Sequence, residues 1–241
     1  MRIVLLLVTV LTAFVGNSQE ITVIYKQEIK TVDILSIDPE KPGESVFTYR
    51  KEYRDNVLRI DDKRSLYYPM NEITNDSISQ QTTIDGVTNT NNYINAKQYS
   101  VIYKDIDSKT KVSSIHTHFL NRPEDVLISE NLKEYDWTLT DETKIIKGYS
   151  CKRAFYNTTG LNGEKNVISA WYSEDIPTND GPIGYWGLPG LILEIQSNNL
   201  NIKADKITFD IGGFIVSPPT KGKKMTREEM GNKEMMEFLQ N

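Results

Sequence analysis

Apolar and polar residues alternate in short runs along most of this chain. The stretch ITVIYK at residues 21–26 is rich in β-branched residues and places Ile21, Val23 and Tyr25 on one face. A period of two residues is typical of a half-buried β-strand. Before residue 220 no segment keeps a helical period over a useful length, so the pattern predicts a mainly β protein. Comparable runs recur at residues 32–37, 46–51, 57–60, 65–68, 99–104, 111–119, 134–139, 144–146, 148–155 and 167–172.

A glycine-rich stretch, GYWGLPGLILEI at residues 184–195, interrupts this alternation. Pro189 and Gly190 suit a type II turn, which favours proline at its second position and needs a positive φ at the next. The stretch lacks the lysine and the spacing of a phosphate-binding loop, and no serine lies between its glycines as in a nucleophile elbow. We therefore interpret Gly187, Pro189 and Gly190 as a structural turn that leads into a buried strand.

The strands after this turn are predicted to pair and to bend. Residues 191–195 place every second residue on an apolar face, and residues 200–204 return along a partner strand. The apolar phase then slips by one residue at Asp205–Lys206, which predicts a β-bulge. The polar segment 71–92 is rich in Asn, Thr, Ser and Gln, and we expect a long loop or a hairpin around Asp85–Gly86.

The C-terminal segment has a different pattern. Residues 217–222, SPPTKG, form a stiff, proline-rich linker. Thr226 and Glu229 have the spacing of a helix capping box, and Met225 and Met230 occupy the positions of a hydrophobic staple. The pattern predicts one C-terminal helix that begins directly after Thr226.

These elements predict a curved antiparallel sheet or a half-open barrel with a C-terminal helix. The chain has 241 residues, which is enough for one sizeable core. We expect a β domain over residues 19–216, with the hexamer GLPGLI at residues 187–192, and a linker with the helix over residues 217–241. The helix would pack on the sheet or cover one of its edges.

Residues 1–18 have the features of a secretory signal peptide. Arg2 supplies a positive charge, residues 3–15 are almost wholly apolar, and small residues precede Gln19. The apolar run is shorter than the roughly 20 residues that a membrane span needs. We therefore expect cleavage before Gln19 and export to the periplasm, the outer membrane or the cell surface. No cysteine follows the run and no later stretch is suited to cross a bilayer, so we expect neither a lipoprotein nor a transmembrane segment in the mature chain.

The charge and the cysteine content limit the functions and the kinds of stabilisation that are open to this chain. The formal net charge is −5, with acidic and basic residues interspersed, which argues against nucleic-acid binding. Cys151 is the single cysteine, so the chain cannot form an internal disulfide and must be held together by its core. We expect Cys151 to be a small buried residue, with an intermolecular disulfide or a metal ligand as the alternatives.

The two histidines are the candidate metal ligands. His116 and His118 point to the same face if they lie on one strand, and two imidazoles make half of a zinc or copper site. A third ligand would come from Cys151, Asp136 or Glu134, which are candidates by residue type alone. The alternative is a solvated strand face, which suits histidines that alternate with Ser and Thr.

No catalytic set stands out. A nucleophilic site would pair Cys151 with His116 or His118, but no local sequence marks Cys151 as a nucleophile. Acidic residues are plentiful, yet none stand out as a pair for glycoside hydrolysis. We therefore favour a protein without enzymatic activity and keep a hydrolase as an alternative, which a pocket that joins Cys151 to a histidine would support.

Aromatic residues concentrated in the second half of the chain are the candidate binding residues. Large aromatic side chains suit strands and β cores, so one interpretation places them in the core. The other is an aromatic-lined groove that holds an apolar ligand or a partner peptide. The residues are Trp137, Trp171, Tyr172, Tyr185 and Trp186.

The complete hexamer at residues 187–192 is the signature of the GLPGLI family, which this chain resembles over about residues 131–196. The resemblance implies an exported, mostly β protein of a Bacteroidota-type bacterium, and it implies no particular reaction. Further motifs match in the same order: Asp136–Trp137, Lys144, Gly148–Tyr149, Cys151, Ala154, Ala170, Trp171–Tyr172, Ile176–Pro177 and Gly181–Pro182.

We expect an exported binding or accessory protein of the cell envelope. Its concave sheet face would hold an apolar ligand or dock onto an outer-membrane partner. The alternative is a periplasmic protein that binds copper or zinc through His116 and His118. A sheet interior without a cavity would argue against the ligand-binding version.

Overall fold

The computed structural model describes residues 20–37, 45–71, 76–84, 87–95, 99–119, 122–159, 163–210 and 214–238. The predicted signal peptide, residues 1–18, lies outside the described residues, and so does the expected turn at Asp85–Gly86. His118 belongs to a described strand, but its side chain is outside this description.

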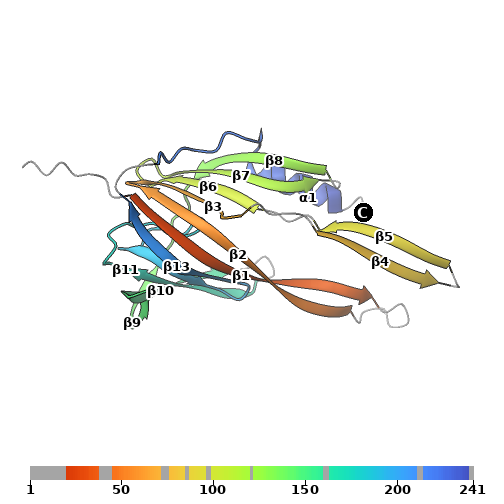
Figure 1. The fold of residues 1–241 in the computed structure, drawn as a ribbon, viewed down its shortest axis with the longest axis horizontal. Helices are drawn as coiled ribbons and strands as arrows, with labels where there is room; N and C mark the ends of the chain where they lie inside the picture. The colour runs from red at the N-terminus through yellow and green to blue at the C-terminus, as the bar shows by residue number, and fades with distance from the viewer. Residues whose placement is uncertain are drawn as a thin grey trace, which may run out of the picture.

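Twelve strands form one open, curved sheet (Figure 1). Their order is β14-β8-β7-β6-β3-β2-β1-β13-β12-β11-β10-β9, and neighbours are antiparallel except β14 with β8. A hairpin, β4–β5, is inserted between β3 and β6 and forms a separate small sheet. The bounds are β1 (Glu20–Ile37), β2 (Ser45–Asp61), β3 (Arg64–Pro69), β4 (Asp76–Ile84), β5 (Val87–Asn95), β6 (Tyr99–Asp105), β7 (Thr110–Phe119), β8 (Arg122–Asn131), β9 (Thr138–Ile146), β10 (Tyr149–Thr159), β11 (Lys165–Ser173), β12 (Leu191–Gln196), β13 (Leu200–Asp210), β14 (Lys223–Lys224) and α1 (Arg227–Phe238).

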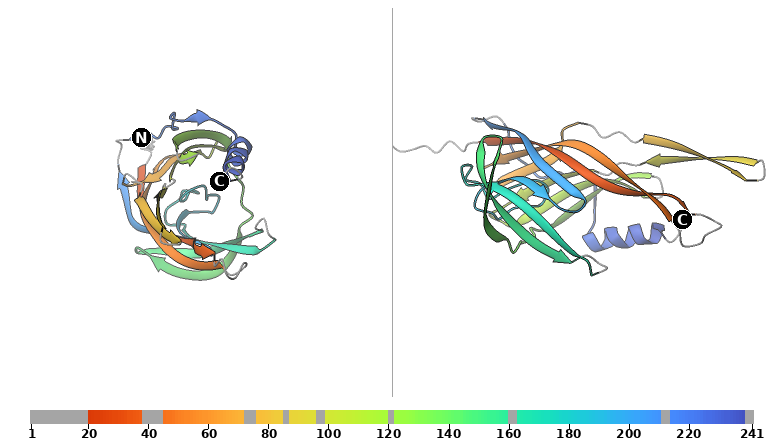
Figure 2. Two further views of the ribbon diagram at one scale, coloured as in Figure 1. Left: turned by 90° about the vertical axis from the view of Figure 1, so that its right-hand side faces the viewer. Right: turned by 90° about the horizontal axis from the view of Figure 1, so that it is seen from below.

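The large sheet wraps around a central space without closing (Figure 2). Strands β1 and β13 pair with a register shift, since Ile24 lies opposite Lys206 while Tyr25 lies opposite Ala204. Asp205 is therefore an extra residue, and such a bulge increases the local bend. The predicted bulge is confirmed, and so are the mainly β fold, the curved antiparallel sheet and the C-terminal helix.

The loop between β11 and β12, residues 174–190, folds back into the curve of the sheet, and we call it the inner segment (Figure 2). Leu188 is buried and joins the main hydrophobic core, together with Val23 and Tyr25 of β1. The Tyr25 hydroxyl donates a 2.6 Å hydrogen bond to the carbonyl oxygen of Ile192 just beyond the segment. The glycine-rich stretch thus fills part of the concave face.

A buried ion pair anchors the inner segment to the sheet. Lys104 of β6 is fully buried, and its Nζ contacts Asp180 Oδ1 and donates a 2.6 Å hydrogen bond to Gly181 O. Burial lowers the pKa of Lys104, and the nearby Asp180 carboxylate opposes that shift. Asp180 Oδ2 finds no hydrogen-bond partner within the described residues. Ion pairs of this kind gain little net stability but cost a great deal when one partner is lost.

The glycines of the inner segment act differently from the prediction. Gly187 has a φ of 92°, in the left-handed region, whereas Gly190 does not have a positive φ. The predicted type II turn at Pro189–Gly190 is therefore wrong. Gly190 is needed for close packing instead, because a Cβ there would lie 2.1 Å from the carbonyl oxygen of Ser173.

Helix α1 packs on the concave side of β7 and β8 (Figure 2). The predicted capping box is confirmed, because Thr226 N donates to Glu229 Oε2 at 2.7 Å and Glu229 N donates to Thr226 Oγ1 at 3.1 Å. Met230 is buried against Ile115, and Met225 packs against the same cluster, as the predicted staple requires. Within the described ranges, no helix has the length and apolar character to cross a membrane.

The close approach at Gly190 leads to a stability prediction. Gly190→Ala should lower the free energy of unfolding by about 1–3 kcal/mol, because the added methyl group overpacks against the Ser173 backbone. Urea unfolding measures the change. Gly231→Ala is the matched control: Gly231 lies in α1 with open space around it, so alanine should be neutral or raise stability by up to about 1 kcal/mol. Equal effects at both glycines would contradict this account.

The buried ion pair leads to a second prediction. Lys104→Met should lower the free energy of unfolding by about 3–5 kcal/mol, because Asp180 is left buried without its cation. The double variant Lys104→Met/Asp180→Leu should be more stable than the single one, since it removes the uncompensated charge. Thermal and urea unfolding of both variants would test this, and a double variant less stable than Lys104→Met would refute it.

Candidate functional site

Four aromatic side chains meet at the side of the inner segment, and we call them the aromatic cluster: Tyr135, Trp137, Tyr156 and Tyr185. The ring centre of Tyr135 lies 5.4 Å from Trp137, 5.5 Å from Tyr156 and 5.4 Å from Tyr185. Lys133 Nζ lies 5.0 Å from the centre of the Tyr156 ring, within cation–π range. All four rings are only partly buried.

The aromatic cluster also holds the inner segment in place. Trp137 Nε1 donates a 2.9 Å hydrogen bond to Trp186 O, and the Tyr135 hydroxyl donates to Gly184 O at 3.2 Å. Trp186 Nε1 in turn donates to Lys133 O at 2.7 Å. Burial raises the pKa of Tyr135 above its usual value, so this hydroxyl stays a donor.

The predicted aromatic residues therefore divide into two groups. Trp137 and Tyr185 come together in the aromatic cluster, where the sequence analysis missed Tyr135 and Tyr156. Trp171 and Tyr172 belong to the main core, and Trp186 belongs to a small second core. The core interpretation holds for Trp171, Tyr172 and Trp186, and an aromatic-lined groove at Trp137 and Tyr185 stays a prediction.

His116 and Cys151, the two candidate metal ligands whose side chains the structure describes, are not assembled into a site. Cys151 is buried in the main core, and burial raises the pKa of its thiol to about 11. His116 on β7 instead donates a 2.8 Å hydrogen bond from Nδ1 to Asp125 Oδ1. In the part of the chain that the structure describes, no three His, Cys, Asp or Glu side chains are placed to hold a metal ion.

His116 belongs to a small polar contact with the C-terminal linker. Its ring stacks on Tyr99 with the ring centres 4.8 Å apart. Asp125 also accepts from Lys221 Nζ, with a separation of 2.7 Å. Hydrogen bonds from Lys221 and His116 lower the pKa of Asp125. This contact fastens the linker to β8 beside the β14 pairing.

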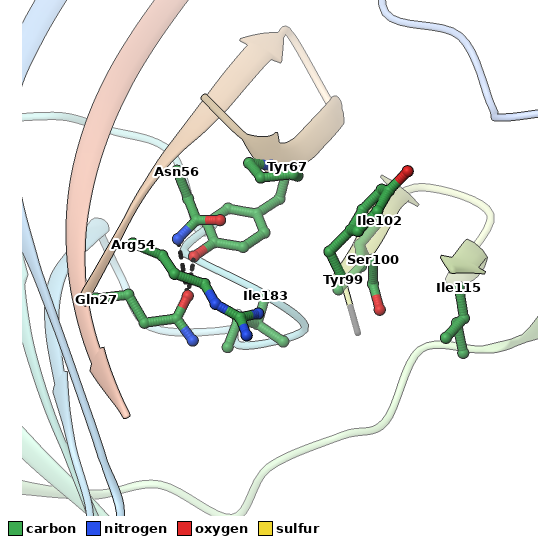
Figure 3. Close-up of a pocket in the computed structure, with 10 residues that line it drawn as sticks. Gln27, Arg54, Asn56, Tyr67, Tyr99, Ser100, Ile102, Ile115 and Ile183 are labelled. Atoms are coloured by element: carbon green, nitrogen blue, oxygen red, sulfur yellow. Dashed lines mark hydrogen bonds between the residues drawn. The ribbon is translucent and has the colours of Figure 1, made fainter. Parts of the chain in front are cut away.

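A cavity of about 260 Å³ lies on the concave face beside the tip of the inner segment (Figure 3). One wall is polar and is built from Gln27 of β1, Arg54 and Asn56 of β2, and Tyr67 of β3. The sequence analysis missed this site, because its residues come from strands far apart in the chain. One signal was available: Gln27 continues the inward face of Ile21, Val23 and Tyr25, where an apolar residue would be expected.

The polar wall is held by its own hydrogen bonds. Gln27 Oε1 accepts from Asn56 Nδ2 at 2.8 Å and from the Tyr67 hydroxyl at 3.3 Å (Figure 3). Arg54 Nη2 lies 2.9 Å from Glu52 Oε2, and both side chains are mostly buried. Burial raises the pKa of Tyr67, while the positive charge of Arg54 opposes that shift. The wall therefore presents oriented amide and guanidinium groups.

The opposite wall is mainly apolar and partly strained. Ile102 of β6, Ile115 of β7 and Ile183 of the inner segment line it, together with Tyr99 and Ser100 of β6. Ile183 has a φ of 57°, a left-handed conformation that β-branched residues rarely adopt. Such strain persists where the surrounding structure over-determines it, and it concentrates at functional sites. The cavity thus offers an aliphatic surface on one side and hydrogen-bonding groups on the other.

The contact at Asp125 leads to a pH-dependent prediction. The pKa of Asp125 is lowered in the folded protein, so the carboxylate contributes stability above its unfolded pKa of about 4 and loses it as pH falls through the folded value. We expect Asp125→Asn to lower the free energy of unfolding near neutral pH, with a difference from wild type that shrinks below pH of about 4. Urea unfolding across pH measures this. Ser129→Asn, exposed on the same strand, should follow wild type throughout, and a constant difference for Asp125→Asn would contradict the prediction.

Comparison with known proteins supports the fold more than the function. The family described as "Protein of unknown function (Porph_ging)" matches residues 158–194, which include the glycine-rich hexamer. A search of curated proteins gives no match. A solved structure of PNGF-II in the P21 space group is similar over 89% of this chain, with a TM-score of 0.53 and 16% identity, and the C2 form gives 90%, 0.52 and 16%. The chain spans 33% and 32% of those two proteins, so the likeness concerns the fold of one part of them.

Proposed function

We propose that this chain is an exported binding protein of the cell envelope, without enzymatic activity, that holds an apolar group of its ligand in the concave cavity. The observation that carries the proposal is the pairing of an isoleucine wall with a hydrogen-bonding wall across one cavity. Binding sites for small molecules combine these two features, with apolar contacts for affinity and a few polar groups for orientation.

The size of the cavity argues for a small occupant. Its volume of about 260 Å³ lies just below the roughly 300–1,000 Å³ of sites for drug-sized ligands. A single aliphatic side chain with its neighbouring polar groups suits this volume, whereas a whole lipid does not. A segment of an outer-membrane partner is therefore favoured over a free lipid.

The expected location also supports a role in the envelope. The N-terminal sequence has the features of a signal peptide, and the chain resembles the exported GLPGLI family. We propose that the protein is located in the periplasm, at the outer membrane or at the cell surface. The part of the GLPGLI stretch before β12 belongs to the inner segment, which forms one side of the cavity through Ile183, so the signature segment supports the site rather than supplying its chemistry.

Ile183 allows a direct test with N-acetyl-leucinamide as the probe. We expect the probe to shift the NMR methyl signals of Ile102, Ile115 and Ile183 saturably, and Ile183→Gly to abolish the shifts of the other two. Glycine removes the apolar wall but relieves about 1–2 kcal/mol of backbone strain, so the variant should remain folded. Ile145→Gly, at an exposed site on β9, is the matched control and should bind as wild type does. Absence of saturable shifts in the wild type would count against the proposed function.

A further inference from the structure

We propose that the cavity binds one aliphatic residue of an extended peptide through the backbone of that residue. The N–H of the residue donates to Asn56 Oδ1, its C=O accepts from Gln27 Nε2, and its side chain lies against the isoleucine wall. This inference rests on the proposed function, because it assumes that the cavity is the binding site.

Asn56 supplies an unused hydrogen-bond acceptor. Its side chain lines the cavity from β2, and the residue is only 5% exposed. Asn56 Nδ2 donates to Gln27 Oε1 at 2.8 Å, whereas Asn56 Oδ1 accepts no hydrogen bond within the part of the chain that the structure describes. Buried polar groups are nearly always hydrogen-bonded, and one that is not needs an explanation. A ligand N–H that enters the cavity would satisfy this oxygen.

Gln27 supplies the matching donor from the neighbouring strand β1. Its Oε1 already accepts from Asn56 and from the Tyr67 hydroxyl. A carboxamide also carries two N–H donors, and Gln27 Nε2 has no partner among the described residues. Figure 3 shows this nitrogen turned away from Asn56. One wall of the cavity therefore presents both an acceptor and a donor that the protein itself does not use.

The backbone of an extended residue complements this pair. In an extended chain the N–H and the C=O of one residue point to the same side, and facing residues of antiparallel strands exchange two hydrogen bonds in this way. A peptide bound in a cavity of this kind can use its main chain for affinity and a side chain for specificity. An ester or a carboxylate offers acceptors alone and would leave Asn56 Oδ1 without a donor.

The charge of the cavity suits an uncharged peptide group. Arg54 is the one charged side chain among the described residues that line it. Its Nη2 lies 2.9 Å from Glu52 Oε2, and Arg54 has a further interaction besides this one. The guanidinium is thus compensated within the protein, so the ligand need not supply a charge.

The isoleucine wall determines which side chain is accepted. Ile102, Ile115 and Ile183 present only apolar side-chain atoms to the ligand. A polar side chain placed against them would lose its hydration without gaining a hydrogen bond, which is unfavourable. A residue such as leucine, valine or isoleucine satisfies both walls at once.

The test uses the full chain and two probes that differ at one position. The first is N-acetyl-leucinamide. The second is 2-acetoxy-4-methylpentanamide, in which an ester oxygen replaces the N–H of the leucine residue. NMR titration of the isoleucine methyl signals measures the Kd of each probe. We expect the ester to bind about tenfold more weakly, because its oxygen cannot donate to Asn56 Oδ1. This comparison needs no substitution in the protein.

Variants of the polar wall assign the two hydrogen bonds. Asn56→Leu should reduce the ratio of the two Kd values to about one. Gln27→Met should weaken both probes by a similar factor, because the C=O that Gln27 reads is present in both. Asn166→Leu is the matched control and should keep the wild-type ratio, since Asn166 accepts a 2.8 Å hydrogen bond from Asn198 on β11, outside the cavity. The ratio within one variant does not depend on the folded fraction.

Failure of this inference is distinguishable from failure of the proposed function. Equal affinity of the two probes in the wild type would overturn the backbone inference and leave the cavity as the binding site. A tenfold ratio that survives in Asn56→Leu would refute the assignment of the acceptor to Asn56. Absence of saturable shifts with both probes would count against the proposed function itself and would overturn the inference with it.

Discussion

The buried contact between Lys104 and Asp180 decides where the inner segment lies, and the concave face depends on that placement. Lys104 reaches from β6 to the segment and also donates to Gly181 O. Both charged groups are almost wholly inaccessible to water, and in this position of the segment each charge has the other as its partner. The ion pair therefore fixes the position of the inner segment and adds little net stability, as is common for buried ion pairs.

The cavity follows from this anchor. If the inner segment were absent, the curved sheet would leave a wide opening, and the apolar residues of β1 and β12 would be exposed. The segment packs into that space, and hydrogen bonds from Trp137 and Tyr135 to its backbone also hold it. What remains is the small volume between Ile183, Gln27 and β6. Strain at Ile183 is the local cost of this arrangement, which the packing around the segment offsets.

The path of the inner segment explains the glycine-rich hexamer in physical terms. Gly190 passes so close to the backbone of Ser173 that no side chain fits, and Gly187 adopts a left-handed conformation. Leu188 and the first residues of β12 then enter the main core. The motif is thus a sharp return from the concave face into a buried strand. The geometry of this return is demanding, and it explains the residues of the hexamer without any chemistry.

The sequence by itself determined most of the local structure: the majority of the strand runs, the bulge at Asp205 and the capped C-terminal helix. These depend on residues close together in the chain, so their periodicity and spacing are visible without a fold. The sequence pattern missed β8 and placed a strand at residues 134–137, which the structure leaves irregular. Only the tertiary structure determined the cavity, the aromatic cluster and the burial of Cys151 in the main core. The polar wall joins Gln27 to Asn56, and its opposite wall comes from three further elements. No spacing encodes such a meeting, because sheet order and the anchored inner segment bring these side chains together.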